Sequence, residues 1–338
     1  MQLLQDHSIK NLNTFGVDVK AKYFVEVISR DELINILSDK KLKEEKKIIL
    51  GGGSNVLFTK DFNGIVIKVS IPEIKVVGEN SDSFIIEAGA GVIWDELVDY
   101  SVEKNYGGIE NLKLIPGTVG AAPIQNIGAY GQELADTFVS LKGVFINSGE
   151  GKIFNKKDCR FSYRSSIFRQ KLKNEFVITS VQLRLSKSPK VNTTYKTLRE
   201  YLIQNKILNP IIQDTSKAVA EIRRRRLPDP AKIGNAGSFF KNPVVSEEIF
   251  LNLKSKYPAI ASFTADAGRV KISAGWLIEK CGWKGKRIGD VGTSPDHALV
   301  ICNFGNGSGS EILEFAMRIK ESVVNKFGIE LEEEVNMI

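Results

Sequence analysis

Residues 47–69 read KIILGGGSNVLFTKDFNGIVIKV, and they carry the strongest indication of the fold class. Three consecutive glycines follow the apolar run 47–50, and residues 64–69 indicate a second strand. In a dinucleotide-binding βαβ unit the glycine turn opens a helix, because the pyrophosphate rests on that helix N-terminus. Here a strand follows instead, and Val56 stands where the motif needs its third glycine. We therefore expect a backbone nest that binds an anion, with a plain glycine-rich turn as the alternative.

The 338 residues are enough for two or three domains, and 26% are charged while 42% are hydrophobic, as in ordinary globular proteins. No run of 18 or more apolar residues and no signal-peptide pattern occurs, so we expect a cytoplasmic protein. Three scattered cysteines and two histidines favour neither a disulfide framework nor a metal site. A net charge of +7 and a pI of about 9.1 fit an anionic partner such as nucleic acid, nucleotide or phosphosugar.

Hydrophobic periodicity predicts the elements around the nest. Ser29 and Glu32 have the spacing of a capping box, which predicts a helix to about residue 41. Strands are predicted at 74–78, 83–88, 139–147, 176–186 and 329–338, and helices at 92–104, 215–226, 246–256, 273–281 and 310–327. The longer helices after about residue 205 indicate a separate C-terminal part.

Residues 115–133, IPGTVGAAPIQNIGAYGQE, carry no charge before Glu133. The segment is too apolar for an exposed linker and too rich in glycine for a helix or strand. Because glycine has no Cβ, such a backbone can approach a large ligand closely. We expect this loop to contact a ligand, and a buried loop made only for packing is the alternative.

Five blocks of sequence together resemble one family. They are GGGSNVL at 51–57, PGTVGAAPIQNIGAYG at 116–131, CRFSYRSSIF at 159–168, GNAGSFFKNP at 234–243 and LEEEV at 331–335. In their order and spacing they resemble the UDP-N-acetylenolpyruvoylglucosamine reductase (MurB) family, in its form with a tyrosine loop. The resemblance extends from residue 11 to the C-terminus.

The resemblance implies an α+β fold, with a two-part FAD-binding domain of the vanillyl-alcohol-oxidase/PCMH type followed by a smaller α/β substrate-binding domain. The implied boundaries are 1–70 with 326–338 for the first FAD-binding subdomain, 71–205 for the second, and 206–325 for the UDP-sugar domain. The implied reaction is the NADPH-dependent reduction, through FAD, of UDP-N-acetylglucosamine enolpyruvate to UDP-N-acetylmuramate. This is a step of peptidoglycan synthesis, on which cell wall, cell shape and cell division depend. The implied enzyme is a monomer that binds no nucleic acid and does not insert into membranes.

The FAD is expected to be non-covalent. A histidyl-flavin bond would need a histidine near the glycine-rich loops, and neither of the two histidines, His7 and His297, is near them in the sequence. We expect the nest at 51–55 to bind the pyrophosphate, and Gln125, Asn126 and Tyr130 to offer amide groups and a ring. The cofactor contacts that the resemblance implies are Gly51, Gly52, Gly53, Ser54, Asn55, Val56, Leu57, Pro116, Gly117, Thr118, Gly120, Ala121, Gln125, Asn126, Ile127, Gly128, Tyr130 and Ile178.

The resemblance implies three catalytic residues, Arg164, Ser238 and Glu334. Hydride addition to an enolpyruvyl group leaves negative charge on the α-carbon and carboxylate, which the Arg164 guanidinium would stabilise. Ser238 would then protonate the α-carbon, and Glu334 would polarise the carboxylate. Taken alone, each residue has a simpler alternative. Arg164 could form a surface ion pair, the Ser238 hydroxyl could be structural, and Glu334 could lie on an exposed acidic strand. Strand alternation would place Glu332 and Glu334 on one face and Glu333 on the other.

The implied substrate contacts are Tyr163, Tyr195, Arg226, Asn242, Lys284 and His297, with Tyr195 as the loop tyrosine. A solvated helix end is the alternative for the arginine run 223–226, and a core histidine is the alternative for His297.

The sequence departs from the family at Asn336, where an arginine is frequent, and at Ala121 and Ala122, where serines are frequent. Two other functions compete with the reductase. One is an FAD oxidase of another small substrate. The other is a basic nucleic-acid-binding protein, although no recognition motif of that class is present.

Overall fold

The computed structural model describes residues 1–265 and 268–338, and it divides into two compact units. The first unit comprises Met1–His7, Ala21–Gly53 and Asn63–Arg225; the second comprises Ser8–Lys20, Ser54–Phe62 and Arg226–Ile338. Each unit is therefore assembled from three separate pieces of the chain. The units do not coincide with the three domains that the resemblance implies, and those boundaries stay a prediction.

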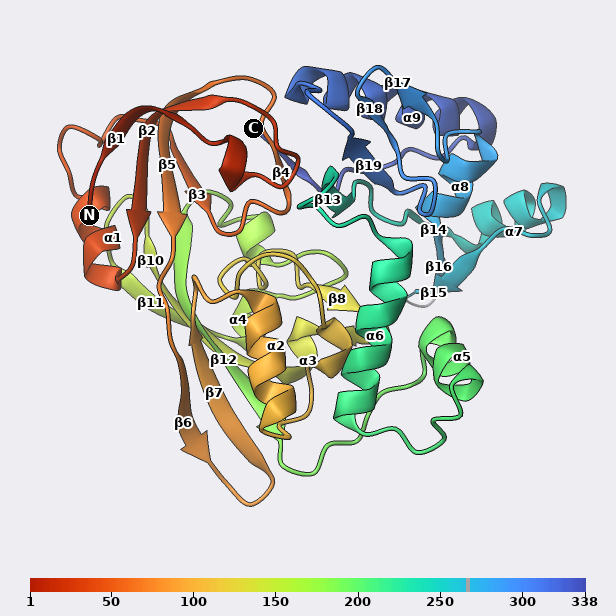
Figure 1. Cartoon of the computed structure of the whole chain (residues 1–338), viewed down its shortest axis with the longest axis horizontal. Coiled ribbons are helices and arrows are strands. Elements are labelled where there is room, and N and C mark those ends of the chain that lie inside the picture. The colour runs from red at the N-terminus through yellow and green to blue at the C-terminus, as the bar shows by residue number, and fades with distance from the viewer. Residues whose placement is uncertain (266–267) are drawn as a thin grey trace. The chain divides into compact units, whose positions relative to one another are not determined.

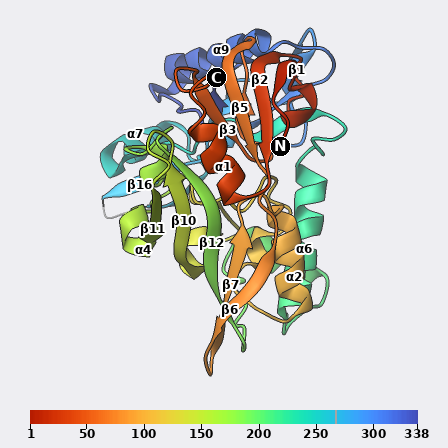
Figure 2. The same ribbon diagram turned by 90° about the vertical axis from the view of Figure 1, so that its left-hand side faces the viewer.

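The first unit contains two main sheets. One has the strand order β1 (Leu4–Ser8), β2 (Lys20–Val27), β5 (Phe62–Val69), β3 (Lys47–Leu50), and the other has the order β11 (Gly151–Asn155), β10 (Phe138–Phe145), β12 (Phe176–Ser186), β7 (Ser83–Gly89), β6 (Ile74–Glu79). Figure 2 shows β10, β12 and β7 within the second, antiparallel sheet. β3 and β5 pair in parallel, and residues 51–61 between them form no helix. This confirms the strands expected on both sides of the glycines.

The helices of the first unit are α1 (Arg30–Leu37), α2 (Trp94–Glu103), α3 (Leu134–Thr137), α4 (Lys156–Cys159), α5 (Lys196–Gln204) and α6 (Ile212–Arg226). As predicted, the Ser29 hydroxyl caps α1 by accepting a hydrogen bond from the Glu32 N–H at 3.1 Å. The helix ends at Leu37, four residues before the predicted end, because Asp39 accepts a hydrogen bond from the Lys41 N–H and makes a local turn.

The second unit contains a four-stranded sheet in the order β13 (Gly234–Ser238), β19 (Val300–Asn303), β18 (Val291–Thr293), β17 (Arg287–Ile288). A smaller sheet has the order β14 (Val244–Ser246), β16 (Arg269–Ile272), β15 (Ser262–Thr264). Its helices are α7 (Glu247–Lys256), α8 (Ala274–Lys280) and α9 (Gly309–Phe327), each within two residues of its predicted bounds. Figure 1 shows α9 beside β18 and β19.

Short strands complete both units. In the first unit, β8 (Gly128–Ala129) pairs with β9 (Gln132–Glu133) inside the long glycine-rich loop. In the second unit, β20 (Asn336–Met337) pairs in parallel with β4 (Val56–Leu57), directly after the glycine nest. The predicted strand at 329–338 is thus regular only over its last residues.

One face of each long helix supplies the core. Helix α2 buries Trp94, Leu97 and Val98 in the cluster that lines the five-stranded sheet. Helix α9 buries Phe315 and Ile319, among others, on a single face. Each such side chain contributes about 1.5–3 kcal/mol through burial, so these helices are fixed by packing more than by their own propensity. Within the described ranges, every helix is too short or too polar to span a bilayer.

Candidate functional site

The three glycines after β3 leave no room for side chains. A Cβ on Gly51 would collide with the Thr118 hydroxyl, and a Cβ on Gly52 would lie 2.9 Å from the Gly117 Cα. Gly53 has a φ of +62°, in the left-handed region that favours glycine. The nest at 51–53 therefore lies directly against the glycine-rich loop that begins at residue 116.

Backbone hydrogen bonds hold that loop in an extended course. Three bonds of 2.9–3.0 Å join it to residues 90–94; they run from Trp94 N to Gly117 O, from Val119 N to Val92 O, and from Gly120 N to Ala90 O. The buried Thr118 hydroxyl has no hydrogen-bond partner among the described residues. Two close backbone segments with an unsatisfied hydroxyl between them fit the phosphates of a bound dinucleotide, which would accept that hydrogen bond.

Farther along the loop, Asn126 is fully buried and bonds within the first unit. Its amide nitrogen donates to the Glu133 carboxylate at 2.7 Å and to the Ser162 carbonyl at 3.3 Å, and its amide oxygen accepts from Ala135 N–H at 3.0 Å. The Gln125 amide oxygen accepts from Arg169 at 3.2 Å. These hydrogen bonds fix the loop to residues 133–135 and 162–169, and the contact of both amides with the cofactor stays a prediction.

Arg164 lies in a tight turn held by these same contacts. Ser162 and Ser165 exchange two backbone hydrogen bonds of 3.0 Å, and Arg164 between them has a φ of +51°. Its guanidinium donates to the Gly128 carbonyl at 2.7 Å and lies 5.4 Å from the centre of the Tyr163 ring. A left-handed conformation costs a non-glycine residue about 1–3 kcal/mol. In this strained conformation Arg164 is joined to the glycine-rich loop through the Gly128 carbonyl.

Two tyrosines from different predicted sets meet in the first unit. Tyr130 and Tyr195 pack edge to face, with ring centroids 5.3 Å apart. Tyr195 directly precedes α5, whose Leu198 and Leu202 pack in the same cluster. Helix α5 was not predicted, although the spacing of these two leucines is the signal that could have revealed it.

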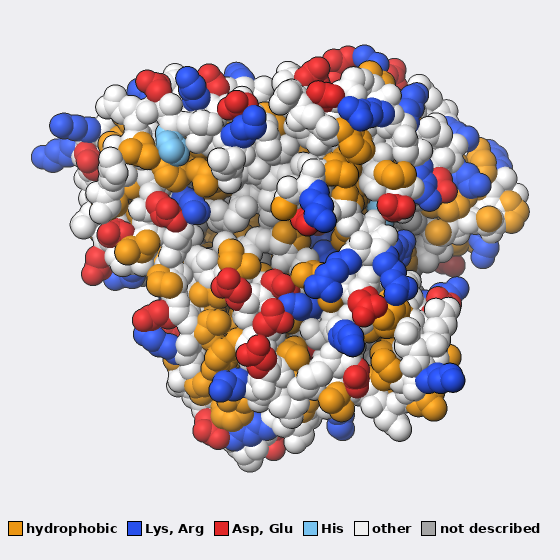
Figure 3. Space-filling model, viewed as in Figure 1, with side chains coloured by type: hydrophobic (Ala, Val, Ile, Leu, Met, Phe, Trp, Pro, Cys, Tyr) orange, Lys and Arg blue, Asp and Glu red, His pale blue; other side chains and the backbone are white. Residues whose placement is uncertain are grey.

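The arginine run at the end of α6 is not uniform. Arg224, Arg225 and Arg226 are exposed, whereas Arg223 is partly buried and its Nε atom has no partner among the described residues. Burial lowers the pKa of Arg223, and the neighbouring Tyr130 and Asp95 act in the opposite direction. A solvated helix end is therefore wrong for Arg223. Figure 3 shows Lys and Arg side chains gathered over α6.

In the second unit, Ser238 is the last residue of β13, opposite Val300 of β19. The buried Asn235 shapes the approach to it by accepting a hydrogen bond from Gly237 N–H at 3.0 Å and donating to the Ile233 carbonyl at 2.8 Å. Gly237 has a φ of +69°, and the strand register shifts between Asn235 and Ser238. β13 is therefore irregular directly before Ser238, and the Ser238 side chain is half-buried.

The acidic C-terminal segment lies alongside Ser238. Glu334 N–H donates to the Phe239 carbonyl and Lys241 N–H donates to the Glu332 carbonyl, both at 2.8 Å. Glu332 forms an ion pair with Lys241, and Glu333 forms one with Lys320. The pairing of residues 332–334 with 239–241 brings Glu334 next to the residue that follows Ser238. Arg164 belongs to the first unit, so two of the three predicted catalytic residues share a unit.

Three predicted substrate residues of the second unit, Asn242, Lys284 and His297, lie on loops, whereas Arg226 is the last residue of α6. Asn242 accepts a hydrogen bond from Ala274 N–H at 2.9 Å, at the start of α8. The Lys284 Nζ atom lies 3.4 Å from the Glu279 Oε2 atom, with which it forms an ion pair. The half-buried His297 accepts from Leu299 N–H through Nδ1 at 3.3 Å, three residues before β19. In a neutral ring with Nδ1 as acceptor, Nε2 carries the proton.

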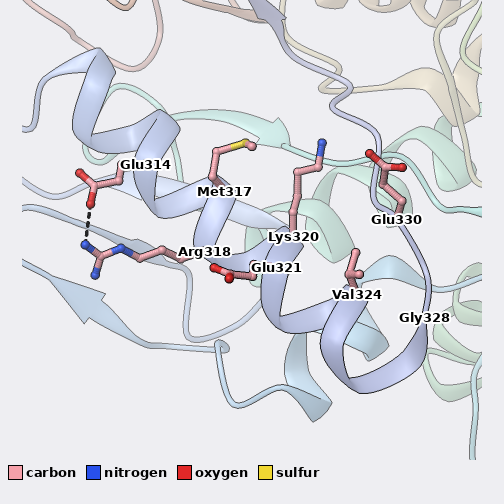
Figure 4. Close-up of a pocket in the computed structure, with 8 residues that line it drawn as sticks. All are labelled: Glu314, Met317, Arg318, Lys320, Glu321, Val324, Gly328 and Glu330. Carbon is pink, nitrogen blue, oxygen red and sulfur yellow. Dashed lines mark hydrogen bonds and ion pairs between the residues drawn. The ribbon is translucent and has the colours of Figure 1, made fainter.

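An open groove follows the outer side of α9, where Figure 4 shows Met317 and Val324 among charged side chains. It contains none of the predicted site residues, so it is not the candidate site. Among the described residues, no cluster of three potential metal ligands occurs. The thiols of Cys159 and Cys302 are buried, which raises the pKa of each to about 12.

Comparisons with known proteins match both parts of the chain. The FAD binding domain family matches residues 21–155, and the UDP-N-acetylenolpyruvoylglucosamine reductase, C-terminal domain family matches residues 229–338. This order confirms the expected α+β FAD-binding domain followed by a second domain. Curated relatives named UDP-N-acetylenolpyruvoylglucosamine reductase, from Flavobacterium johnsoniae and Amoebophilus asiaticus, are 45% and 46% identical, each over 100% of both chains. The solved structure of this reductase from Thermus caldophilus covers 99% of this chain and 98% of its own, with a TM-score of 0.69 and 24% identity, which shows a shared fold.

Proposed function

Since the chain belongs to the UDP-N-acetylenolpyruvoylglucosamine reductase family, we propose that its glycine cradle, Arg164, Ser238 and Glu334 carry the family's reaction. The protein is an FAD-dependent oxidoreductase of peptidoglycan precursor synthesis with NADPH as co-substrate. It reduces UDP-N-acetylglucosamine enolpyruvate to UDP-N-acetylmuramate. Membership of this family sets aside the oxidase and nucleic-acid-binding alternatives.

We assign the FAD phosphates to the nest at 51–55 and to the backbone of residues 116–120. When bound there, FAD would supply the hydride, received from NADPH, that reduction of the enolpyruvyl β-carbon requires. The supporting observation is the close approach of Gly52 to Gly117, together with the buried Thr118 hydroxyl beside Gly51. The remaining proposed cofactor contacts lie farther along that loop, on β4 at Val56 and Leu57, and at Ile178, a buried residue of β12.

Hydride addition makes the α-carbon and its carboxylate electron-rich, and the protein must stabilise that charge. The cationic guanidinium of Arg164 is held in place by the Gly128 carbonyl and the Tyr163 ring. A positive group that is positioned in advance stabilises developing charge without reorganising, which is the most effective form of electrostatic catalysis. Arg164 is thus assigned to the substrate carboxylate.

The α-carbon then takes a proton, for which Ser238 is the assigned donor. A hydroxyl is a weak acid, but an enediolate-like carbon is a strong base, so the transfer succeeds when the geometry is fixed. Glu334 is assigned to polarise the same carboxylate. The observation that carries this proposal is the pairing of residues 332–334 with 239–241, which brings Glu334 to Ser238 from the far end of the chain.

For the UDP-sugar we assign contacts to Tyr163, Tyr195, Arg226, Asn242, Lys284 and His297, with Tyr195 on the tyrosine loop and most of the UDP site within 206–325. The exposed Arg226 and the half-buried His297 suit the diphosphate, since both can donate hydrogen bonds to anionic oxygens. We also propose a cytoplasmic monomer with non-covalent FAD that binds no nucleic acid and does not insert into membranes.

Rapid anaerobic mixing separates the two half-reactions and tests Ser238. In Ser238→Ala, NADPH should reduce the flavin at the wild-type rate, whereas reoxidation by the enolpyruvyl substrate should slow by about 10²- to 10⁴-fold. The control is Ser246→Ala, because the Ser246 hydroxyl only caps α7 in the same unit. Reoxidation of Ser238→Ala at the wild-type rate would refute the proton-donor role.

A further inference from the structure

Asn55, the residue at the end of the glycine nest, uses its side chain away from the nest. Its amide nitrogen donates to the backbone carbonyl of Glu334 at 3.2 Å, within the second unit. The backbone of Asn55 belongs to the proposed phosphate cradle, whereas its side chain contacts the C-terminal segment that contains Glu334. The Asn55 amide therefore links the end of the glycine nest to the C-terminal segment.

Glu334 is held at both of its backbone polar groups. Its N–H donates to the Phe239 carbonyl at 2.8 Å, next to Ser238, and its carbonyl accepts from Asn55. Fixing the two peptide groups around one Cα sets the direction in which the side chain leaves the backbone. The carboxyl group of Glu334 is thus aimed by contacts that it does not itself make.

Asn336 completes the arrangement from the other side. Its backbone N–H and its side-chain amide both donate to the Asn55 carbonyl at 3.0 Å. The β4–β20 pairing begins at this point, with Asn336 opposite Val56, so Asn55 is fixed while it holds Glu334. Figure 1 shows the C-terminus beside β4. An asparagine at 336, where the family often has arginine, therefore has a role in this chain.

We propose that Asn55 is a positioning residue for Glu334: its side-chain amide fixes the Glu334 carbonyl and thereby the orientation of the carboxyl group during reduction of the substrate. The inference rests on the catalytic role proposed for Glu334 and goes beyond it. Because a displacement of 1 Å at a catalytic group costs up to about 100-fold in rate, one hydrogen bond at this place matters for catalysis.

A double-mutant cycle on the complete, FAD-loaded enzyme tests the proposal. Flavin reduced by NADPH is mixed anaerobically with UDP-N-acetylglucosamine enolpyruvate, and its reoxidation is followed per bound flavin. Asn55→Ala should slow reoxidation at saturating substrate by about 10- to 100-fold. In the Glu334→Gln background the same change should alter the rate by less than about twofold, because Asn55 acts through Glu334.

Thr59→Val is the matched control, since the Thr59 hydroxyl donates to the Ile338 carbonyl at 2.9 Å in the same tail but lies beyond Glu334. This change should weaken the attachment of the C-terminal residue Ile338 without changing the reoxidation rate. If Asn55→Ala retains too little flavin, Asn336→Ala should show the same coupling to Glu334→Gln.

The outcomes distinguish failure of the catalytic role of Glu334 from failure of its positioning by Asn55. If Glu334→Gln reoxidises as fast as the wild type, the role of Glu334 and the positioning by Asn55 both fail. If Glu334→Gln is slow but Asn55→Ala is not, only the positioning fails. Equal slowing by Asn55→Ala in both backgrounds, or slowing by Thr59→Val, would also overturn it, because the amide would then act independently of Glu334.

Discussion

A single methyl group at Gly52 would test the proposed cradle. In Gly52→Ala the new Cβ would lie 2.9 Å from the Gly117 Cα, so one of two backbone segments must move. We expect the purified protein to retain less FAD, measured as flavin absorbance per protein and as the affinity for added FAD. Gly275→Ala in α8 is the control, because its Cβ would meet Leu299 at an ordinary 3.6 Å. Full flavin occupancy in Gly52→Ala would contradict the cradle.

Among single residues, some structural roles could be predicted from the sequence and others could not. The backbone role of the glycines was predictable, because it follows from the glycine run and the residues next to it in the sequence. The partners of Asn126 and the burial of Arg223 were not, since both depend on segments that lie far away in the sequence. Asn55 illustrates the same limit: its motif indicates a nest, and only the fold shows that its side chain reaches Glu334.

Among the elements, α9 offers a direct test of capping. The Ser308 hydroxyl accepts from Glu311 N–H at 3.2 Å, and the Glu311 carboxylate accepts from Ser308 N–H at 2.7 Å, which completes a capping box. Ser308→Ala should lower the free energy of unfolding by about 1 kcal/mol, within a usual range of about 0.5–2 kcal/mol. Denaturant titration measures the change, with the exposed Asn325→Ala as control. An equal loss in both variants would speak against the cap.

The same carboxylate predicts a response to acid. Hydrogen bonds from the Ser308 backbone, followed by the Ser308 hydroxyl, lower the pKa of Glu311 below its ordinary 4.5. A lowered pKa means that the stabilisation is present above pH 4.5 and is lost as the pH falls through the folded-state value. Thermal midpoints from pH 6 to pH 3 should therefore fall less steeply in Glu311→Gln than in the wild type. Parallel curves would contradict this.

The predicted helices and most of the predicted strands lie within a few residues of observed elements, because hydrophobic periodicity and capping residues mark them locally. The short strands β13 to β19 of the second unit were not predicted. Strands β1 and β2 were also missed, although exposed and buried side chains alternate along most of β2, with an interruption at the adjacent buried residues Phe24 and Val25. The C-terminal strand was predicted too long. Its pairing changes partner from residues 239–241 to β4 near Glu334, and no local pattern marks that change.

For the molecule as a whole, the two buried thiols predict a loss of stability at alkaline pH. Burial, with a smaller effect of Asp158, raises the pKa of Cys159 to about 12, and burial alone raises that of Cys302 to about 12. The folded state therefore keeps both protons from pH 9 to pH 12, whereas the unfolded chain loses them above pH 9. Stability is retained below pH 9 and falls by up to about 1.4 kcal/mol per thiol for each further pH unit.

The Cys159→Ala/Cys302→Ala variant isolates this effect. It should be less stable at pH 8, because truncation leaves cavities, but its thermal midpoint should fall less steeply between pH 9 and pH 11. The wild type provides the matched series for the other groups that titrate there. Identical slopes in the two proteins would contradict the prediction.

The pairing of β4 with β20 has a consequence for synthesis on the ribosome. Asn55 and Asn336 stand 281 residues apart, so β4 leaves the ribosome long before its partner is made. At about 5–20 residues per second the wait lasts roughly 14 to 56 s. Residues 54–62 spend that time without their strand partner. A message that ends a few codons early would release a nearly full-length chain in which this pairing never forms.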